Sequence, residues 1–166
     1  MLIHWYRFNN WLYRHHIPFL PWFIWKLQYL IFNCSVPASC KLGKGTKFGY
    51  GGIGVVLHSR AVLGENCIIG TNVTIGGKSR WYEVPVIGNN VDISTGAKIL
   101  GPIKIGDNVT IGANAVVVKD VPDNCVVAGI PAKIIKMNVN DTEGHNDNEY
   151  RYRGDNPWPM TPMSNN

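Results

Sequence analysis

The sequence predicts an all-β fold, a parallel β-helix of hexapeptide repeats with a short N-terminal helical segment and an irregular C-terminal tail. Every sixth position carries a branched aliphatic residue, and a small apolar residue follows four positions after each of them. A period of six is typical of a β-helix, in which three short strands form one triangular coil of about eighteen residues. The two series are Ile87, Ile93, Ile99, Ile105, Ile111 and Val117, and Val91, Ala97, Ile103, Val109, Ala115 and Val121.

The same phase extends backwards, so the repeats span residues 57–121. Before this stretch the phase slips, because Phe48 and Leu57 are nine residues apart. We expect a loop or bulge at residues 50–54, where glycines supply the backbone freedom. The earlier positions in phase are Leu57, Leu63, Ile69 and Ile75.

Residues 78–85 interrupt the repeat without changing its phase. Ile75 and Ile87 are twelve residues apart, and the position halfway between them is Trp81. A narrow prism filled by Val and Ile cannot accept an inward tryptophan without overpacking, and three charged residues in this stretch do not belong in a core. We therefore predict that residues 78–85 form an outward loop, where binding and chemistry are often located.

Composition divides the chain of 166 residues into three parts. Residues 1–33 hold eleven of the eighteen aromatic residues and no acidic residue, and the first acid of the chain is Glu65. Residues 34–136 contain the repeats. Residues 137–166 are rich in Asn, Asp, Glu and Pro, which predicts a flexible or loosely docked tail.

Residues 1–33 are expected to form two helices separated by Pro18 and Pro21. The apolar stretch 22–32 is interrupted by Lys26 and Gln28, so it is too short and too polar to span a membrane. The helices either cap the open end of the β-helix or lie on a membrane interface through their tryptophans. Both interpretations place the protein in the cytoplasm, and the second places it at the inner face of the membrane.

Charge and cysteine content argue against two other kinds of site. The net charge of +5 comes from scattered Lys and Arg residues without a nucleic-acid-binding motif, so we expect no nucleic acid partner. The four cysteines show no CxxC or Cys/His spacing, which argues against a metal site and a disulfide framework. Cofactor phosphates or a membrane surface are more suitable partners for this positive charge than nucleic acid.

Five segments resemble the left-handed β-helix acyltransferases, and in particular their serine-acetyltransferase-like branch that is associated with polysaccharide biosynthesis. The resemblance covers about residues 36–136. It implies left-handed coils and a homotrimer that binds acetyl-CoA in the groove between neighbouring prisms. The segments are Gly-Val-Val-Leu-His (54–58), Ile-Gly-Thr-Asn-Val-Thr-Ile-Gly-Gly (69–77), Val-Ile-Gly (86–88), Gly-Ala-Lys-Ile-Leu-Gly (96–101) and Ala-Gly-Ile-Pro-Ala-Lys-Ile-Ile (128–135).

The sequence departs from true serine acetyltransferases at two positions. Those enzymes carry one catalytic histidine before the Gly-Ile-Val-Val segment and another in the loop after the Gly-Gly pair. The corresponding positions here are Gly51 and Val84, whereas His58 is a feature of the short polysaccharide-type enzymes. The resemblance thus implies an acetyl-CoA-dependent O-acetyltransferase that acts on a hydroxyl of a sugar or polysaccharide precursor. Serine and an amino sugar are the alternative acceptors.

His58 is the candidate general base. It is the only histidine within the repeats, and it follows the inward residue Leu57, so its side chain should point outward at a corner. A spacing of eighteen residues predicts that His58, Gly76, Ser94 and Gly112 stack on one edge. A sugar hydroxyl must lose its proton as it attacks a thioester. Imidazole titrates near neutral pH and can accept that proton and give it to the departing thiolate.

Two donors are candidates for stabilising the oxyanion that forms on the acetyl group. One is a backbone N–H in the Gly76–Gly77 turn, which makes Gly76 a candidate cofactor contact, and the other is the indole N–H of Trp81. Some capsule O-acetyltransferases of this fold pair the histidine with a tryptophan in the next loop, and Trp81 resembles that residue. Trp81 is therefore the second candidate catalytic residue, with Tyr82 as its substitute.

The contacts to acetyl-CoA are implied by resemblance to the thiogalactoside acetyltransferases. Thr95 and Ala113, one coil apart, would offer backbone contacts to the pantetheine arm. Lys119, Lys133 and Lys136 would meet the phosphates of the cofactor as point charges. No metal is implied.

Two other functions are compatible with a β-helix. A γ-type carbonic anhydrase needs three metal-binding histidines, whereas the repeats contain only His58, which argues against that activity. A non-catalytic scaffold subunit would need neither His58 nor the terminal lysines. The scaffold therefore stays open as an alternative to the enzyme.

Overall fold

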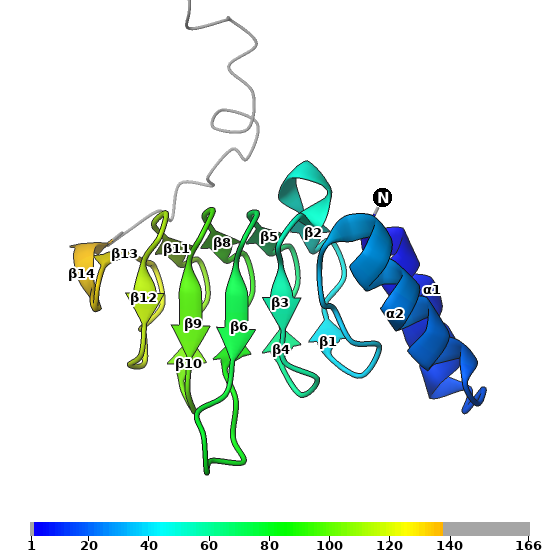
Figure 1. The fold of residues 1–166 in the computed structure, drawn as a ribbon. Coiled ribbons are helices and arrows are strands. Elements are labelled where there is room, and N and C mark those ends of the chain that lie inside the picture. The colour runs from blue at the N-terminus through cyan, green and yellow to red at the C-terminus, as the bar shows by residue number, and fades with distance from the viewer. Residues whose placement is uncertain (1, 138–166) are drawn as a thin grey trace, which may run out of the picture.

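The computed structural model describes residues 2–137, which form two helices followed by a solenoid of three parallel sheets (Figure 1). The helices are α1 (Leu2–Arg14) and α2 (Leu20–Phe32). We name the sheets A, B and C. Sheet A contains β3 (Val56–Leu57), β6 (Thr74–Gly76), β9 (Lys98–Leu100) and β12 (Val116–Val117). Sheet B contains β1 (Lys41–Leu42), β4 (Val62–Leu63), β7 (Val86–Ile87) and β10 (Lys104–Ile105). Sheet C contains β2 (Lys47–Phe48), β5 (Ile68–Ile69), β8 (Asp92–Ile93), β11 (Thr110–Ile111), β13 (Cys125–Gly129) and β14 (Ala132–Met137).

The predicted fold class, a left-handed parallel β-helix, is confirmed. Successive coils pair in parallel within each sheet, as when Leu63 lies beside Ile87 and Ile69 beside Ile93. Among the described strands, β14 is the exception, because it pairs antiparallel with β13 and ends the solenoid. A closed stack of this kind leaves unpaired strand edges only at its two ends.

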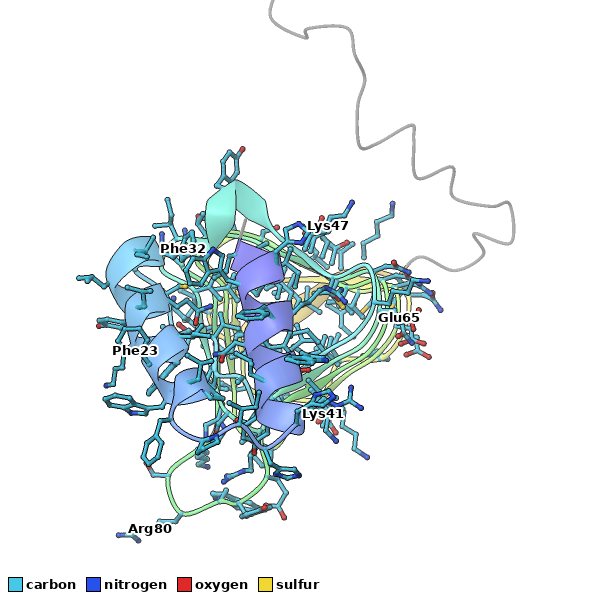
Figure 2. All side chains as sticks on the ribbon, turned by 90° about the vertical axis from the view of Figure 1, so that its right-hand side faces the viewer. Phe23, Phe32, Lys41, Lys47, Glu65 and Arg80 are labelled. Carbon is cyan, nitrogen blue, oxygen red and sulfur yellow. The ribbon has the colours of Figure 1, made fainter. Side chains whose placement is uncertain are left out.

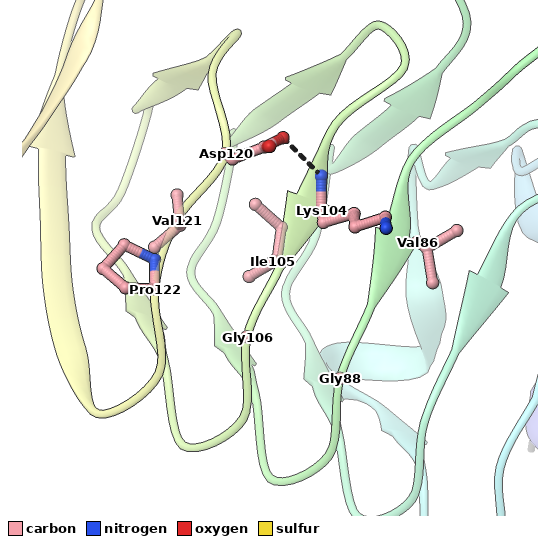
Figure 3. A pocket seen from close by; sticks show the side chains of 8 residues that line it. All are labelled: Val86, Gly88, Lys104, Ile105, Gly106, Asp120, Val121 and Pro122. Atoms are coloured by element: carbon pink, nitrogen blue, oxygen red, sulfur yellow. Dashed lines mark hydrogen bonds between the residues drawn. The ribbon is translucent and has the colours of Figure 1, made fainter.

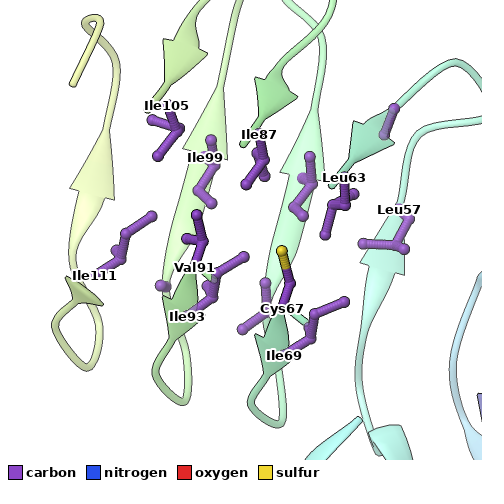
Figure 4. Packing of buried hydrophobic residues seen from close by; sticks show 14 of the residues in the cluster. Leu57, Leu63, Cys67, Ile69, Ile87, Val91, Ile93, Ile99, Ile105 and Ile111 are labelled. Carbon is purple, nitrogen blue, oxygen red and sulfur yellow. The ribbon is translucent and has the colours of Figure 1, made fainter. Parts of the chain in front are cut away.

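The inward residues of the strands fill the prism and form its core (Figure 4). In strands such as β7 and β8 the first residue is exposed and the second is buried, which is the alternation of a pleated strand. The predicted series is confirmed, because Ile87, Ile93 and Ile99 are buried, and so are small residues of the second series such as Ala97 and Ala115.

Two corners of the prism flank sheet A and carry most of the candidate site residues. The A–B corner, where the chain passes from sheet A to sheet B, contains residues 58–61, 77–85, 101–103 and 118–120. The C–A corner, where the chain enters sheet A, contains residues 70–73, 94–97 and 112–115. In Figure 1 the A–B corner lies below sheet A and the C–A corner above it.

The loop at residues 78–85 lengthens one coil of the solenoid. Leu57 pairs with Ile75, eighteen residues later, but Ile75 pairs with Ile99, which is 24 residues later. Trp81 is 54% exposed, so the predicted outward loop is present. The added six residues enter at the A–B corner, so pairs that span the loop are 24 residues apart, whereas later pairs such as Ile93 and Ile111 are again 18 apart.

The slip before Leu57 is absorbed by a short turn at the C–A side of the first coil. This turn is the 3-10 segment η1 (Gly49–Gly52). Tyr50, with a φ of 46°, and Gly51, with a φ of 75°, both adopt the left-handed backbone conformation. Gly52 is packed so closely that a Cβ there would lie 2.2 Å from Leu2 Cδ2. Glycine is required at this position for packing as well as for conformation.

Helix α1 covers the open end of the solenoid. Leu2 and Tyr6 belong to the same buried cluster as the inward residues of the coils, and the Tyr6 hydroxyl donates a 2.6 Å hydrogen bond to the Cys40 carbonyl oxygen. The Asn10 side chain donates to the Ala38 carbonyl oxygen at 2.7 Å. The first of the two interpretations, helices that cap the prism, therefore describes α1.

The described residues reach only the first residue of the predicted tail and contain no membrane-spanning helix. Of the predicted tail at 137–166, Met137 ends β14 and the rest lies outside the described residues. Between residues 2 and 137, the structure contains no helix with the length and apolar character needed to cross a membrane.

Candidate functional site

His58 lies at the A–B corner directly after β3. Its backbone N–H donates to the Ile75 carbonyl oxygen at 2.8 Å, and its side chain is half-buried at the prism edge. Gly76, which follows Ile75, occupies the same position one coil later and pairs with Leu100. The predicted stack of four is therefore wrong beyond Gly76. Ser94 and Gly112 follow Ile93 and Ile111 of sheet C, because the enlarged coil shifts them to another corner.

The imidazole of His58 is oriented by the backbone of its own turn. The Arg60 backbone N–H donates a 3.1 Å hydrogen bond to His58 Nδ1. Nδ1 therefore acts as the acceptor, and in the neutral ring the proton lies on Nε2. In this arrangement neither ring nitrogen offers a free lone pair to an acceptor hydroxyl. Base catalysis at His58 requires that the ring turn away from the Arg60 N–H.

The side chain of Arg60 holds the loop at residues 78–85 against the His58 turn. Its Nη2 donates a 2.6 Å hydrogen bond to the Tyr82 carbonyl oxygen, and its guanidinium carbon lies 4.1 Å from the centre of the Tyr82 ring. The hydrogen bond and the cation–π contact together fix the loop to the corner. The structure thus brings together His58 and the loop that carries Trp81, although they are 23 residues apart in sequence.

Trp81 stands on the exposed side of this loop. Its backbone N–H donates to the Lys78 carbonyl oxygen at 3.1 Å, which closes the turn, and Lys78 Nζ lies 5.9 Å from its ring. At the base of the loop, Gly77 packs against Val84, and a Cβ at Gly77 would lie 3.2 Å from Val84 Cγ1. Val84 is buried, so the place of the second serine-acetyltransferase histidine belongs to the apolar base of the loop.

Thr95 and Ala113 stack at the C–A corner, one coil apart as predicted. The Asn114 backbone N–H donates to the Thr95 carbonyl oxygen at 2.9 Å, so this carbonyl is engaged within the solenoid. The Thr71 hydroxyl, one coil earlier, lies 3.3 Å from the Thr95 hydroxyl. These contacts form a ladder of small side chains along the corner, and Ala113 beside it is exposed.

The three candidate lysines are all exposed but do not form one cluster. Lys119 lies in the last coil of the A–B corner, the corner that also carries His58. Lys133 and Lys136 lie on β14, where they pair with Ala128 and Val126 at the end of sheet C. The six-residue period could not predict the positions of Lys133 and Lys136, because β14 turns back along β13 instead of continuing the coils.

His58 and the two candidates for the pantetheine arm, Thr95 and Ala113, occupy opposite ends of sheet A. Within one coil, Thr71 at the C–A corner and Gly76 at the A–B side are five residues apart, which is about 16 Å along an extended strand. Figure 2, an end-on view, shows the loop with Arg80 at one edge of the prism. Within a single chain the His58 turn and Thr95 therefore do not meet.

Arg60 is the residue that the sequence analysis missed. In the sequence it is one of the scattered Lys and Arg residues, and the residues around it do not indicate a role in the site. Its role depends on the loop folding back over the His58 turn, which a hexapeptide pattern does not encode. Its spacing from His58 within the same turn is the one signal that could have pointed to it.

A recess in the solenoid surface lies elsewhere, on the outer face of sheet B (Figure 3). It is shallow and mostly apolar, and the Lys104 backbone N–H donates to Asp120 Oδ1 at its edge at 2.8 Å. It contains neither His58 nor the loop at 78–85, so we do not assign the reaction to it. Its lining residues are Val86, Gly88, Lys104, Ile105, Gly106, Asp120, Val121 and Pro122.

The four cysteines are buried, free thiols. Desolvation by burial raises the pKa of Cys34 to about 11 and that of Cys40 to about 12, so both thiols stay protonated at neutral pH. In the described part of the chain, no three His, Cys, Asp or Glu side chains are grouped as metal ligands.

Comparisons with known proteins point to one kind of enzyme. A family model described as bacterial transferase hexapeptide (six repeats) matches residues 85–119. A serine acetyltransferase of Synechococcus elongatus is 39% identical over 132 residues, which cover 78% of this chain and 54% of that protein. The chain spans about half the length of the curated relatives it matches.

Two solved structures extend this similarity to three dimensions. The serine acetyltransferase of Neisseria gonorrhoeae superposes with a TM-score of 0.78 and 35% identity, covering 84% of this chain and 55% of that one. The Brucella abortus serine acetyltransferase in complex with coenzyme A superposes with a TM-score of 0.78 and 34% identity, covering 82% and 55%. These relatives are serine acetyltransferases and not polysaccharide O-acetyltransferases, so they match the alternative acceptor of the sequence analysis.

Proposed function

From a hexapeptide-repeat β-helix that matches the bacterial transferase family, we propose that this chain is an acetyl-CoA-dependent O-acetyltransferase. The observation that carries the proposal is the pair of Arg60 hydrogen bonds to His58 Nδ1 and to the Tyr82 carbonyl oxygen, which we call the Arg60 clamp. This clamp fixes the Trp81 loop beside the His58 turn. The relatives support acetyl transfer, and the coenzyme A complex of one of them supports the cofactor. The division into N-terminal helices (1–33), acyltransferase domain (34–136) and tail (137–166) is part of this proposal.

His58 accepts the hydroxyl proton of the acceptor in the proposed reaction. When the acceptor binds, the ring leaves the Arg60 N–H and turns a nitrogen lone pair toward the hydroxyl. The oxygen then attacks the thioester carbonyl, and the resulting oxyanion accepts hydrogen bonds from the Gly76–Gly77 turn and the Trp81 indole N–H. As the carbon–sulfur bond breaks, the imidazolium gives the proton to the thiolate, which yields free coenzyme A and an acetyl ester.

The cofactor site requires a second copy of the chain in this proposal. Thr95 and Ala113 would contact the pantetheine arm from the C–A corner, while His58 acts from the A–B corner, about 16 Å away along sheet A. The two half-sites meet if the A–B corner of one copy faces the C–A corner of the next, as in the homotrimer that the family resemblance implies. Lys119, Lys133 and Lys136 would then meet the phosphates of acetyl-CoA.

Serine is the first acceptor to test, because the matched relatives are serine acetyltransferases. A sugar hydroxyl is the second, because the chain has Gly51 and Val84 where those enzymes have catalytic histidines. Glycine and valine have no ionisable side chain, so neither position supplies a base. An amino sugar, acetylated on its amine or on a hydroxyl, is a variant of the second acceptor.

Release of free thiol from acetyl-CoA tests the proposal. The full-length chain is incubated with L-serine, with a nucleotide sugar and with a polysaccharide repeat unit, and the product is identified by mass. Acceptor-dependent thiol release with one of them supports an O-acetyltransferase, and the acetylated compound names the acceptor class. If acetyl-CoA is neither bound nor cleaved with any of the three, the scaffold alternative replaces the enzyme.

A further inference from the structure

Helix α2 exposes large apolar side chains and buries a polar one. In α2, Trp22 and Phe23 are 61% and 57% exposed, whereas Gln28 is buried and its Oε1 has no hydrogen-bond partner within residues 2–137. A helix on the surface of a protein in water normally shows the opposite distribution. Capping of the solenoid by α1 explains the buried residues of the hairpin, but it does not explain the exposed ones.

The exposed aromatic residues of the hairpin lie in its turn and along both helices. The Asn9 side chain donates to the Pro21 carbonyl oxygen at 3.2 Å, which places the second half of α1 beside the start of α2. Phe19, in the connecting turn, is 86% exposed. Figure 2 shows Phe23 directed away from the prism. We define the hairpin surface as Arg14, Phe19, Trp22, Phe23, Lys26 and Tyr29.

The charge of the hairpin surface has one sign. Arg14 and Lys26 are exposed, and no acidic residue occurs before Glu65. Lys26 Nζ lies 5.8 Å from the Trp22 ring and 5.0 Å from the Trp25 ring, so its charge is held among the aromatic residues. Two such surfaces facing each other would oppose cation to cation, which disfavours a second copy as the occupant.

We propose that the hairpin surface docks on an anionic phospholipid membrane. Trp and Tyr side chains favour the boundary between headgroups and acyl chains, and basic residues bind the negative surface of the membrane. The hairpin would lie in the plane of the interface, with Trp22 and Phe23 in the lipid and Lys26 among the headgroups. This docking is independent of the proposed acetyl transfer, and it would hold the solenoid at a membrane surface.

Vesicle flotation tests the proposal with the full-length chain. Phosphatidylglycerol-containing vesicles are compared with pure phosphatidylcholine vesicles at low and at high salt. We expect binding to the anionic vesicles that weakens with salt. The Trp22→Ser/Phe23→Ser double variant should bind about tenfold or more weakly, because two exposed rings no longer enter the lipid. Lys26→Gln should weaken binding about fivefold at low salt.

A matched control removes exposed apolar side chains elsewhere. Tyr50 and Ile135 are 87% and 66% exposed and lie off the hairpin, so Tyr50→Ser/Ile135→Ser should float like the wild type. The proposal is overturned if the wild type does not float, or if the hairpin variant floats as well as the control. Sedimentation velocity identifies the rival occupant: a smaller assembly for the hairpin variant, without flotation of the wild type, assigns the surface to a second copy.

Discussion

The guanidinium of Arg60 lies 4.1 Å from the centre of the Tyr82 ring and donates a 2.6 Å hydrogen bond to the Tyr82 carbonyl oxygen. The backbone N–H of the same residue donates to His58 Nδ1 at 3.1 Å. One residue therefore touches both parts of the candidate site, the imidazole through its backbone and the loop through its side chain. Substitution of the side chain separates these contacts, because every non-proline variant keeps the backbone N–H.

Arg60→Ala should loosen the loop while His58 keeps its resting contact. We expect kcat/KM to fall about ten- to a hundredfold, since small misplacements of reacting groups are costly. If the loop binds the acceptor, KM for the acceptor should rise while KM for acetyl-CoA stays unchanged. Arg60→Lys should recover only part of the activity, because an ammonium lacks the planar fork. Arg80→Ala, in the same loop, is the control, and an equal loss there would argue against a specific clamp.

His58→Ala should reduce acceptor-dependent thiol release about a hundred- to ten-thousandfold, which is the usual contribution of a general base. His16→Ala, at an exposed histidine outside the solenoid, should leave the rate unchanged. Rates are compared by thiol release with whichever acceptor supports turnover. Equal rates for His58→Ala and the wild type would show that another group accepts the proton.

Trp81→Phe separates the indole N–H from the aromatic ring. If the N–H stabilises the oxyanion, Trp81→Phe and Trp81→Ala should both lower kcat about a hundredfold or more, because both remove the donor. If the ring only packs in the loop, phenylalanine will restore the wild-type rate. Single-turnover measurement of acetyl transfer distinguishes these results from changes in product release.

Core truncation should destabilise the solenoid in proportion to burial. Ile93→Ala and Ile99→Ala remove fully buried side chains between stacked coils, so each should lower the free energy of unfolding by about 2–5 kcal/mol. Ile135→Ala, at an exposed position on β14, should change it by less than about 0.5 kcal/mol. Urea unfolding followed by circular dichroism measures the difference. Equal effects at the three positions would contradict the assigned inward ladder.

Alkaline pH should destabilise the fold through its buried thiols. Burial raises the pKa of Cys34 to about 11 and of Cys40 to about 12, from an ordinary value of 9.0. Above about pH 9 the unfolded chain therefore loses thiol protons that the folded chain retains. The stabilisation is complete below pH 9 and is lost as pH rises through the folded pKa values.

Urea midpoints at about pH 8 and about pH 10.5 measure this loss. The Cys34→Ala/Cys40→Ala variant, which has no thiol at either buried position, should show a smaller decrease between the two values. An unchanged decrease would mean that other groups cause it. Tyr6 is one such group, because burial also raises the pKa of its hydroxyl.

The repeat itself was predictable because the residue type at each inward position depends only on its place within a short strand. A six-residue period places one side chain of every short strand in the prism, so Ile87, Ile93 and Ile99 could be assigned to the core from spacing alone. The outward loop was predictable for the same reason, since Trp81 could not fit where the period placed it. The slip before Leu57 was predictable from the glycines that form η1.

The stacking across coils was not predictable, because it depends on where an insertion enters the solenoid. The residues at 78–85 add a full hexad to one coil, so Gly76 meets Leu100 and Ser94 belongs to sheet C. The period survives such an insertion, so the spacing of the inward residues does not show that one coil is longer than the others. Only the paired strands reveal which side chains share a corner.

The sequence by itself determined the prism, its buried ladder and His58 as the outward imidazole, because these follow from periodicity and residue type. Tertiary structure decided that Arg60 joins the His58 turn to the Trp81 loop, that Thr95 and Ala113 lie at the opposite corner, and that the hairpin exposes aromatic side chains. Each of these depends on contacts between residues far apart in the chain, which a local pattern does not contain.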